Sequence, residues 1–351
     1  MKRRSFLATG MGAGAGVVAA PAVAQSRAVI RVGSAFAPSA DGRGAIFNRL
    51  AQRVAGLSGG AIELQLALTS PDDDAALRDA LATGSVSAVL ATEDLWIADH
   101  PAFGLFAACP GGMTERELEA YLRAGNGQDT WNALAESFDR RPHYLGDTGA
   151  EYLLSGSEIG SIDAFSGATV ATRGLAVELY RSVGANVIVP AVGSVAGGGA
   201  SMREAGPLAD SYANARAGMT RLYTGTLTRP SGAVSLSIGL AAWNGLDAGS
   251  QAILSAAAEA EAHIVAAEAM QRNALTSQAF RLSGVTADAL PTDVFNAMMN
   301  NARDLFDAIE SRDELGAVVA RSYRDFASDV QTWTRVADAP FVQARRNTIG
   351  A

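Results

Sequence analysis

The chain of 351 residues has few of the side chains from which catalytic and metal sites are built. Cys109 is its one cysteine, which excludes a disulfide within the chain and a zinc site made of several cysteines. His100, His143 and His263 show no metal-ligand spacing, and neither HExxH nor Gly-x-Ser-x-Gly occurs. We therefore expect a protein that is not an enzyme and that has no resident cofactor or metal.

Positive charge and long apolar runs are also scarce. Lys2 is the only lysine, the formal net charge is −8, and beyond residue 4 no basic run is longer than a pair. A nucleic-acid-binding surface needs concentrated positive charge, so nucleic acid is not an expected partner. After Gln25 no uncharged apolar stretch reaches the about 18 residues that a membrane-spanning helix needs. The mature chain is therefore not expected to span a membrane.

What the sequence does have is an export signal at its start. Lys2, Arg3 and Arg4 precede an apolar stretch rich in alanine and glycine, which closes on small residues at 22–24. This pattern predicts a signal peptide over residues 1–24, cleaved after Ala24, and a periplasmic location. Residues 3–7 resemble the twin-arginine signal, which is typical of export in the folded state. A first transmembrane helix is the alternative, but the apolar run is too short and glycine dilutes it.

Predicted strands and helices alternate along the mature chain, which is typical of the α/β class. A first block has strands near 28–33, 62–66 and 85–91 with helices between them, and a capping box predicts a further helix from residue 115. A second block follows residues 146–149 with a strand, a helix and a strand over 168–189. The stretch 234–238 is predicted to return to the first sheet. An unbroken helical pattern over 247–282 is long enough to lie across both domains.

Two short motifs resemble ligand sites without matching them. The acidic run 72–74 lacks the spacing of a calcium loop and is expected to begin a helix, where the dipole favours acids. The glycines at 197–199 have no Gly-Lys-Ser/Thr after them, so we expect a flexible connection rather than a phosphate loop.

Several stretches of the sequence, taken together and in order, are similar to those of a known protein family. They are 45–60 (AIFNRLAQRVAGLSGG), 77–91 (LRDALATGSVSAVLA), 96–108 (WIADHPAFGLFAA), 146–149 (GDTG), and 243–247 (WNGLD) with 251–254 (QAIL). Together they resemble the substrate-binding proteins of tripartite ATP-independent periplasmic (TRAP) transporters, the DctP family, over residues 28 to 333. The pattern around Trp96 and Trp131 is most similar to the branch that binds 2-oxo acids and related small carboxylates.

The resemblance implies a bilobed type II periplasmic-binding-protein fold, with two α/β domains joined by crossing segments and a long bridging helix. The expected division is domain I at 25–149 plus 229–265, domain II at 150–228 plus 283–335, the bridging helix at 247–282, and a tail at 336–351. It also implies a solute-binding protein that captures a small, carboxylate-bearing organic ligand and delivers it to the small and large membrane subunits of a TRAP permease. The alternative is a homologue that has lost ligand binding and acts as a sensory or protein-interaction module.

The site residues implied by the resemblance are partly replaced. Family members carry an arginine that grips the ligand carboxylate, and its position holds Ala171 in this chain. Arg173 lies two residues later, and because strand side chains repeat every two residues, it is expected to point the same way. A surface arginine at a strand end is the alternative reading of Arg173.

The other candidate residues also differ from the family. Glu151 replaces a glutamine, Arg203 and Glu204 replace a glutamate and a tryptophan, and Arg229 precedes Pro230 where the branch has glutamate. Trp96 completes the set of ligand-binding candidates. In some relatives the glutamine and glutamate help hold a metal ion, which an arginine at the glutamate position would oppose. The mixture of charges is expected to suit a zwitterionic or differently shaped carboxylate.

Overall fold

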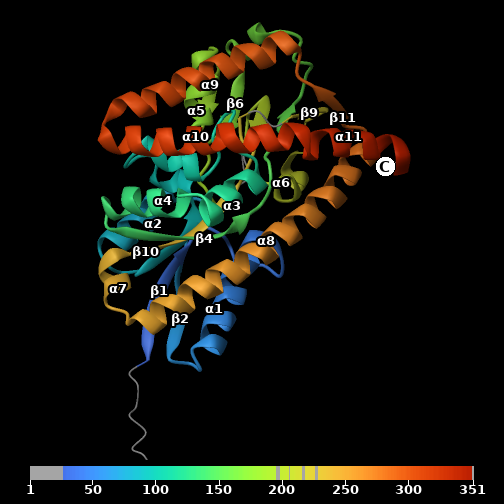
Figure 1. Ribbon diagram of the computed structural model, residues 1–351. Helices are drawn as coiled ribbons and strands as arrows, with labels where there is room; N and C mark the ends of the chain where they lie inside the picture. The colour runs from blue at the N-terminus through green and yellow to red at the C-terminus, as the bar shows by residue number, and fades with distance from the viewer. Residues whose placement is uncertain (1–26, 195–197, 205, 216–217, 226–227, 350–351) are drawn as a thin grey trace, which may run out of the picture.

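The computed structural model describes residues 27–194, 198–204, 206–215, 218–225 and 228–349. The predicted export signal and its cleavage point lie outside the described residues, as does the first glycine of the 197–199 run. Two sheets organise the chain into two lobes, one below the other in Figure 1. We call the part around the N-terminal sheet the first lobe and the part around the other sheet the second lobe.

The sheet of the first lobe has the strand order β2-β1-β3-β10-β4. These strands are β2 (Ile62–Thr69), β1 (Ala28–Ser34), β3 (Ala88–Thr92), β10 (Ala233–Gly239) and β4 (Arg140–Asp147). β1, β2 and β3 are parallel, and β10 is antiparallel to both of its neighbours, so a strand from late in the chain completes the first sheet as predicted. All five residues of β3 are buried, which is typical of a strand covered on both faces.

Short helices connect and cover these strands. α1 (Ile46–Leu57) packs on β2, and α2 (Asp74–Ala82) packs on β1 and β3. The acidic run at 72–74 does begin α2, because the Asp73 side chain accepts the backbone N–H of Ala76 and caps the helix. The 3-10 turns η1 (Gly42–Ala45), η2 (Glu93–Trp96) and η3 (Pro101–Phe106) follow the first and third strands. The predicted capping box is present at the start of α3 (Glu115–Ala124), and α4 (Gly127–Glu136) follows it.

The sheet of the second lobe has the order β11-β9-β5-β8-β6-β7 and mixes parallel with antiparallel pairs. Its strands are short: β11 (Thr286–Ala289), β9 (Arg221–Thr224), β5 (Leu153–Ser155), β8 (Met202–Glu204), β6 (Thr169–Thr172) and β7 (Asn186–Ile188). η4 (Ile162–Phe165), α5 (Ala176–Ser182) and α9 (Thr292–Arg312) cover it through a core that includes Phe165, Tyr180 and Met298. α6 (Leu208–Ala215) lies beside this sheet and contacts α8.

One long helix links the lobes. α8 (Ala248–Leu282) follows the short α7 (Leu240–Asn244), begins at the capping residue Asp247 and runs for 35 residues. It contacts β4 and α1 in the first lobe and α6 in the second, then leads into β11, and Figure 1 shows it crossing the molecule diagonally. The unbroken helical pattern of the sequence therefore corresponds to one continuous helix.

The C-terminal helices return to the first lobe. α10 (Glu314–Val336) pairs with α9, and it also packs on α4 and η3, where Val319 and Tyr323 join the first core. The Tyr323 hydroxyl accepts the backbone N–H of Met113 at 2.7 Å. α10 lies within residues 283–335, which the resemblance assigns to the second domain, and it contacts both lobes. α11 (Asp338–Ile349) ends the described chain, and among the described residues no helix combines the length and apolarity of a membrane span.

Candidate functional site

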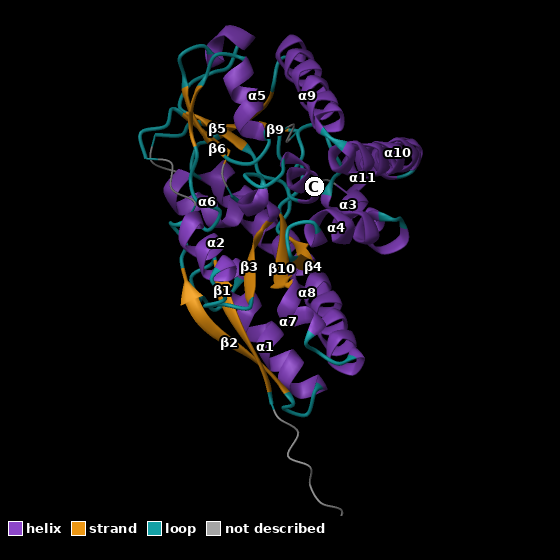
Figure 2. Cartoon of the chain, turned by 90° about the vertical axis from the view of Figure 1, so that its left-hand side faces the viewer, coloured by secondary structure: helices purple, strands orange, loops and turns teal. Residues whose placement is uncertain are grey.

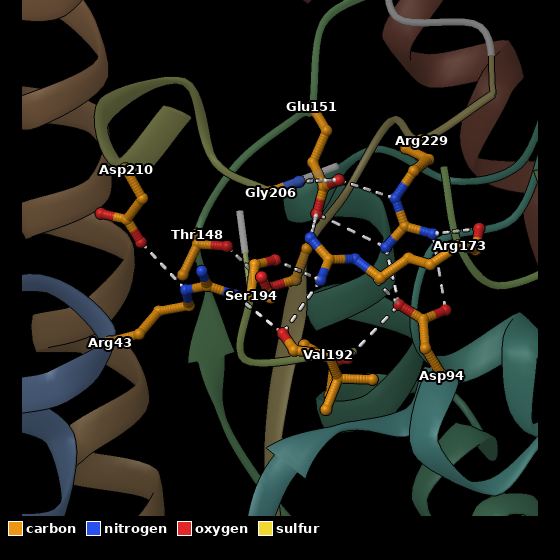
Figure 3. Close-up of polar contacts among 12 residues, drawn as sticks. Arg43, Asp94, Thr148, Glu151, Arg173, Val192, Ser194, Gly206, Asp210 and Arg229 are labelled. Atoms are coloured by element: carbon orange, nitrogen blue, oxygen red, sulfur yellow. Dashed lines mark hydrogen bonds and ion pairs between the residues drawn. The ribbon is translucent and has the colours of Figure 1, made fainter. Parts of the chain in front are cut away.

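Four charged side chains meet between the lobes and form what we call the cleft cluster. Asp94 lies in η2 of the first lobe, Arg173 directly follows β6 of the second lobe, and Glu151 and Arg229 lie on the two segments that cross between the lobes. These crossing segments run side by side, since the backbone N–H of Glu151 donates to the carbonyl oxygen of Arg229 at 3.0 Å. Each of the four side chains is 2% exposed or less. Figure 3 shows them pointing toward one another.

Arg229 donates to oxygens on three sides. Its Nε lies 2.9 Å from Glu151 Oε2, its Nη2 lies 2.7 Å from Asp94 Oδ2, and its Nη1 lies 3.0 Å from the carbonyl oxygen of Arg173. Glu151 also accepts the backbone N–H of Gly206 at 2.5 Å. Arg229 therefore ties a crossing segment to both lobes, and its positive charge is fully paired.

Arg173 uses its guanidinium differently. Its Nη1 donates to the carbonyl oxygens of residues 191, 192 and 194 at 3.3, 2.9 and 3.3 Å. We call residues 191–194 the cleft loop. The Nε and Nη2 of Arg173 are buried and make no hydrogen bond to any described residue. They face Asp94 and Glu151 only at ion-pair distances of 3.9 and 3.6 Å. The Nε and Nη2 edge is the fork with which an arginine holds a carboxylate through two parallel hydrogen bonds.

The charges of the cluster keep one another ionised. Burial raises the pKa of Glu151, but Arg229 and Arg173 outweigh it and hold that pKa at about 2. Burial alone would lower the pKa of Arg229, yet Asp94 and Glu151 raise it above its ordinary value. Burial lowers the pKa of Arg173, which stays charged because arginine is a very weak acid. Two positive and two negative charges leave the cluster without net charge.

Glu204 lies close to the cluster but takes part in a separate set of hydrogen bonds. Its carboxyl accepts the Tyr180 hydroxyl at 3.0 Å and the Thr228 hydroxyl, and the residue is 2% exposed. Burial raises its pKa to about 8, against the opposing charge of Arg229, so Glu204 is mostly neutral at neutral pH. Arg203 precedes Glu204 on β8 and is half-buried. Neighbouring residues of a strand point to opposite faces, so Arg203 faces away from Glu204.

Trp96 lies at the other end of η2 from Asp94 and in a different environment. It is 2% exposed, and the guanidinium of Arg140 lies 4.0 Å from the centre of its ring. Arg140 and Arg78 share the carboxylate of Asp99, at 3.0 and 2.6 Å, and we call these three residues the first-lobe trio. Trp96 and the trio line a hollow of about 750 Å³ in the first lobe. The structure thus separates Trp96 from the other candidate residues.

The cleft loop holds the two lobes together. The backbone N–H of Val192 donates to Asp74 at 3.0 Å, and its carbonyl oxygen accepts Arg43 at 3.2 Å, both from the first lobe. Arg43 also pairs with Asp210 of the second lobe at 2.9 Å. Figure 3 shows the contact between Arg43 and Asp210. The cavity beside this pair has only about 20 Å³, so the lobes are closed on one another there.

The structure brings Arg173, Glu151 and Arg229 together with Glu204 beside them, as candidates that the sequence places in one site. Sequence reasoning missed Asp94, Asp74 and the pair Arg43–Asp210. One signal was available for Asp94, because it follows a buried parallel strand, and ligand sites of open α/β sheets lie at the carboxyl ends of such strands. Among the described residues no group of three or more His, Cys, Asp or Glu side chains is placed to hold a metal ion.

This chain is similar to known proteins in its structure. No model of a known protein family matches the sequence, and no curated protein does. A TRAP periplasmic solute-binding protein from Colwellia psychrerythraea, with bound calcium and pyruvate, is similar with a TM-score of 0.83 at 18% identity, over 91% of this chain and 99% of that chain. A TRAP transporter solute-binding protein from Bordetella bronchiseptica RB50, with copurified calcium and picolinate, has a TM-score of 0.83 at 18% identity, over 92% and 98%.

A marine metagenome TRAP solute-binding protein in complex with pyroglutamate has a TM-score of 0.70 at 13% identity, over 86% of this chain and 99% of that chain. The similarity in each case extends over both lobes, since nearly the whole of each neighbour is matched. The chain therefore has the bilobed α/β fold of the TRAP periplasmic solute-binding proteins.

Proposed function

We propose that this chain is an exported solute-binding protein of a TRAP transporter. It captures a small carboxylate-bearing ligand between its lobes in the periplasm and delivers it to the small and large membrane subunits of a permease. Export through the twin-arginine route, with cleavage after Ala24, belongs to the same proposal. The observation that carries the proposal is the buried Arg173, whose Nε and Nη2 edge makes no hydrogen bond to any described residue.

Arg173 is prepared for a carboxylate in two respects. The cleft loop fixes its Nη1 through three carbonyl oxygens, so the guanidinium is oriented before a ligand arrives. The remaining edge can hold a carboxylate by two parallel hydrogen bonds, which are stronger than neutral ones because both partners are charged. The bound pyruvate, picolinate and pyroglutamate of the structural neighbours are small carboxylates of this kind.

Closure of the lobes explains how such a ligand enters and stays. Asp94 belongs to the first lobe and faces Arg173 and Arg229, so opening the cleft moves it away from both arginines. A ligand carboxylate then pairs with Arg173, and closing places the ligand against both lobes. The cleft cluster has no net charge, so a zwitterion, whose amine pairs with Asp94 or Glu151, suits it better than a simple anion.

The test is a ligand screen on residues 25–351, produced without the signal. Pyruvate, picolinate, pyroglutamate, a set of amino acids and a set of sulfonates are added singly while the unfolding temperature Tm is measured. A ligand that binds the folded state raises Tm, and calorimetry then gives its Kd. We expect at least one small carboxylate to raise Tm, and silence across the whole panel would overturn the proposal.

The matched variants are Arg173→Ala and Arg78→Ala. Both remove one arginine, but only Arg173 presents its fork to the cleft, whereas Arg78 belongs to the first-lobe trio. Loss of the charge-assisted pair is expected to weaken binding at least about 100-fold in Arg173→Ala and to leave Arg78→Ala unchanged. Equal Kd values for both variants would remove Arg173 from the proposed site.

A further inference from the structure

The surroundings of Arg229 are those of a bound cation. The Arg229 side chain is 1% exposed, and its guanidinium lies among two carboxylates and one carbonyl group: Glu151 at 2.9 and 3.4 Å, Asp94 at 2.7 Å and the backbone oxygen of Arg173 at 3.0 Å. Carboxylate and carbonyl oxygens are also the ligands that Ca²⁺ takes in proteins. The oxygens around Arg229 thus form a shell of negative charge with a positive group at its centre.

Two of the structural neighbours hold a calcium ion together with a small carboxylate. The residues of the cleft cluster and the neighbouring Glu204 do not fit an additional cation. The two carboxylates of the cluster are already engaged by Arg229, and Glu204 is mostly neutral because burial raises its pKa to about 8. A further cation would also meet the like charges of Arg173 and Arg229.

We infer that Arg229 is a built-in cation of the cleft, which takes the place of a metal ion and makes ligand capture independent of metals. The part of this inference that concerns ligands rests on the proposed function. The part that concerns cations rests only on the oxygens around Arg229 and can be tested without any ligand.

A guanidinium differs from a metal ion in ways that matter for binding. It is covalently attached, so it cannot dissociate, and its charge persists at every pH at which the protein is folded. Its N–H groups have fixed directions, and the one toward the carbonyl oxygen of Arg173 connects the two arginines directly. The cation of this cleft is therefore part of the fold, with a fixed position relative to Arg173.

The test is to remove the built-in cation and to offer Ca²⁺ in its place. Arg229→Gln keeps a polar side chain of similar reach but leaves Asp94 and Glu151 with Arg173 as their remaining cluster cation, at 3.9 and 3.6 Å. We expect CaCl₂ at saturation to raise the Tm of this variant by about 3 to 5 °C and to leave that of the wild type unchanged. Calcium that stabilises the wild type equally, or that leaves the folded variant unaffected, would overturn the inference.

Two controls separate this effect from general stabilisation by calcium. Arg229→Gln combined with Asp94→Asn has one carboxylate fewer and should lose most of the calcium response. Arg140→Gln removes a buried arginine from the first-lobe trio, where Asp99 stays paired with Arg78, and should gain no response. A response of the same size in Arg140→Gln would contradict a specific role for Arg229.

A measurement on the unmodified chain keeps the inference testable if Arg229→Gln does not fold. The purified wild type is dialysed against EDTA, and its metal content is measured by mass spectrometry. We expect less than stoichiometric calcium or other metal before dialysis, and no change of Tm after it. One tightly held metal ion per chain would overturn the inference, whereas a silent ligand screen would count only against the proposed function.

Discussion

The two arginine clusters of this protein show what burial does to charge. In the first-lobe trio, Arg78 and Arg140 share one carboxylate, and Asp99 and Arg78 are 19% and 36% exposed in their side chains. In the cleft cluster, two arginines face two carboxylates and all four side chains are 2% exposed or less. Water can compensate an unequal pairing only where it has access. Arg78 of the trio reaches water, and the buried Arg140 interacts with the charge of Glu93 as well as with Asp99, whereas the cleft cluster is balanced by its own four side chains.

The two clusters also hold their arginines by different means. Arg140 lies against aromatic rings, at 4.0 Å from Trp96, 5.0 Å from Phe103 and 5.6 Å from Phe138. Arg140 has the Asp99 carboxylate besides these rings, whereas Arg173 and Arg229 are held by oxygen atoms. Arg140 lines a hollow within the first lobe, whereas a ligand on the unbonded Nε and Nη2 edge of Arg173 would contact both lobes. This difference is why we place ligand capture at the cleft cluster and not at the hollow beside Trp96.

The largest expected effect is the difference in the free energy of unfolding that is lost when one arginine is removed from each cluster. Arg229→Ala leaves Asp94 and Glu151 buried without their main partner and is expected to lower the free energy of unfolding by about 3 to 5 kcal/mol. Arg78→Ala removes a partly exposed arginine and should cost about 0 to 1 kcal/mol. Urea unfolding of both variants measures the two values. Equal losses would show that burial does not distinguish the clusters.

A smaller effect is expected from blocking closure of the cleft without touching its charges. A Cβ atom at Gly193 would lie 1.8 Å from the carbonyl oxygen of Ala35, across the lobe boundary. Gly193→Ala should therefore hold the lobes apart and weaken ligand binding about tenfold, which corresponds to about 1.4 kcal/mol. Small-angle scattering should show a larger radius of gyration for this variant in the presence of ligand.

Gly198→Ala is the matched control for this prediction, because a Cβ atom there meets nothing within 4 Å in the described part of the chain. Its affinity and its scattering curve should equal those of the wild type. If Gly193→Ala also behaves like the wild type, the contact between the cleft loop and the first lobe does not limit closure.

The smallest expected effect is on the pH dependence of stability, to which the buried acids Glu204 and Glu151 contribute in opposite directions. Burial raises the pKa of Glu204 from 4.5 to about 8, so its contribution to stability is fully present below pH 4.5 and is lost as the pH rises to about 8. The wild type should therefore lose stability between pH 5 and pH 8. Glu204→Gln stays neutral and should lose at least about 1 kcal/mol less over that interval, as measured by urea unfolding.

Glu151 provides the opposite case within the same region. Its pKa is lowered from 4.5 to about 2, so its contribution is present above pH 4.5 and is lost as the pH falls toward 2. Glu204→Gln should leave the loss of stability below pH 4.5 unchanged. If the variant changed the loss of stability in the acid range as much as that between pH 5 and pH 8, Glu204 and Glu151 would titrate as one unit.

Much of the fold could be predicted because it depends on local patterns. Alternating apolar residues mark β1 and β2, and an unbroken helical pattern marks α8. The two-residue repeat of a strand made Arg173 a candidate with a surface arginine as the alternative, and the structure shows that the residue is buried.

The separation of Asp94 from Trp96 could not be predicted in this way. Both lie in the four-residue turn η2, and the tight turn directs one side chain to the cleft and the other to Arg140. The pair Arg43–Asp210 joins residues that are 167 positions apart on different lobes, so no local pattern signals it. Contacts of this kind depend on how the lobes close, which is a property of the whole chain.

The cleft loop has a consequence for the rate at which a ligand of the proposed site would dissociate. Its carbonyl oxygens hold Arg173 in the second lobe, while its Val192 backbone is bonded to Asp74 and Arg43 in the first. Opening must break the bonds to the first lobe before a ligand on Arg173 reaches solvent. The residence time of the ligand is therefore expected to depend on residues that never contact it, and Asp74→Ala should speed dissociation more than it slows association.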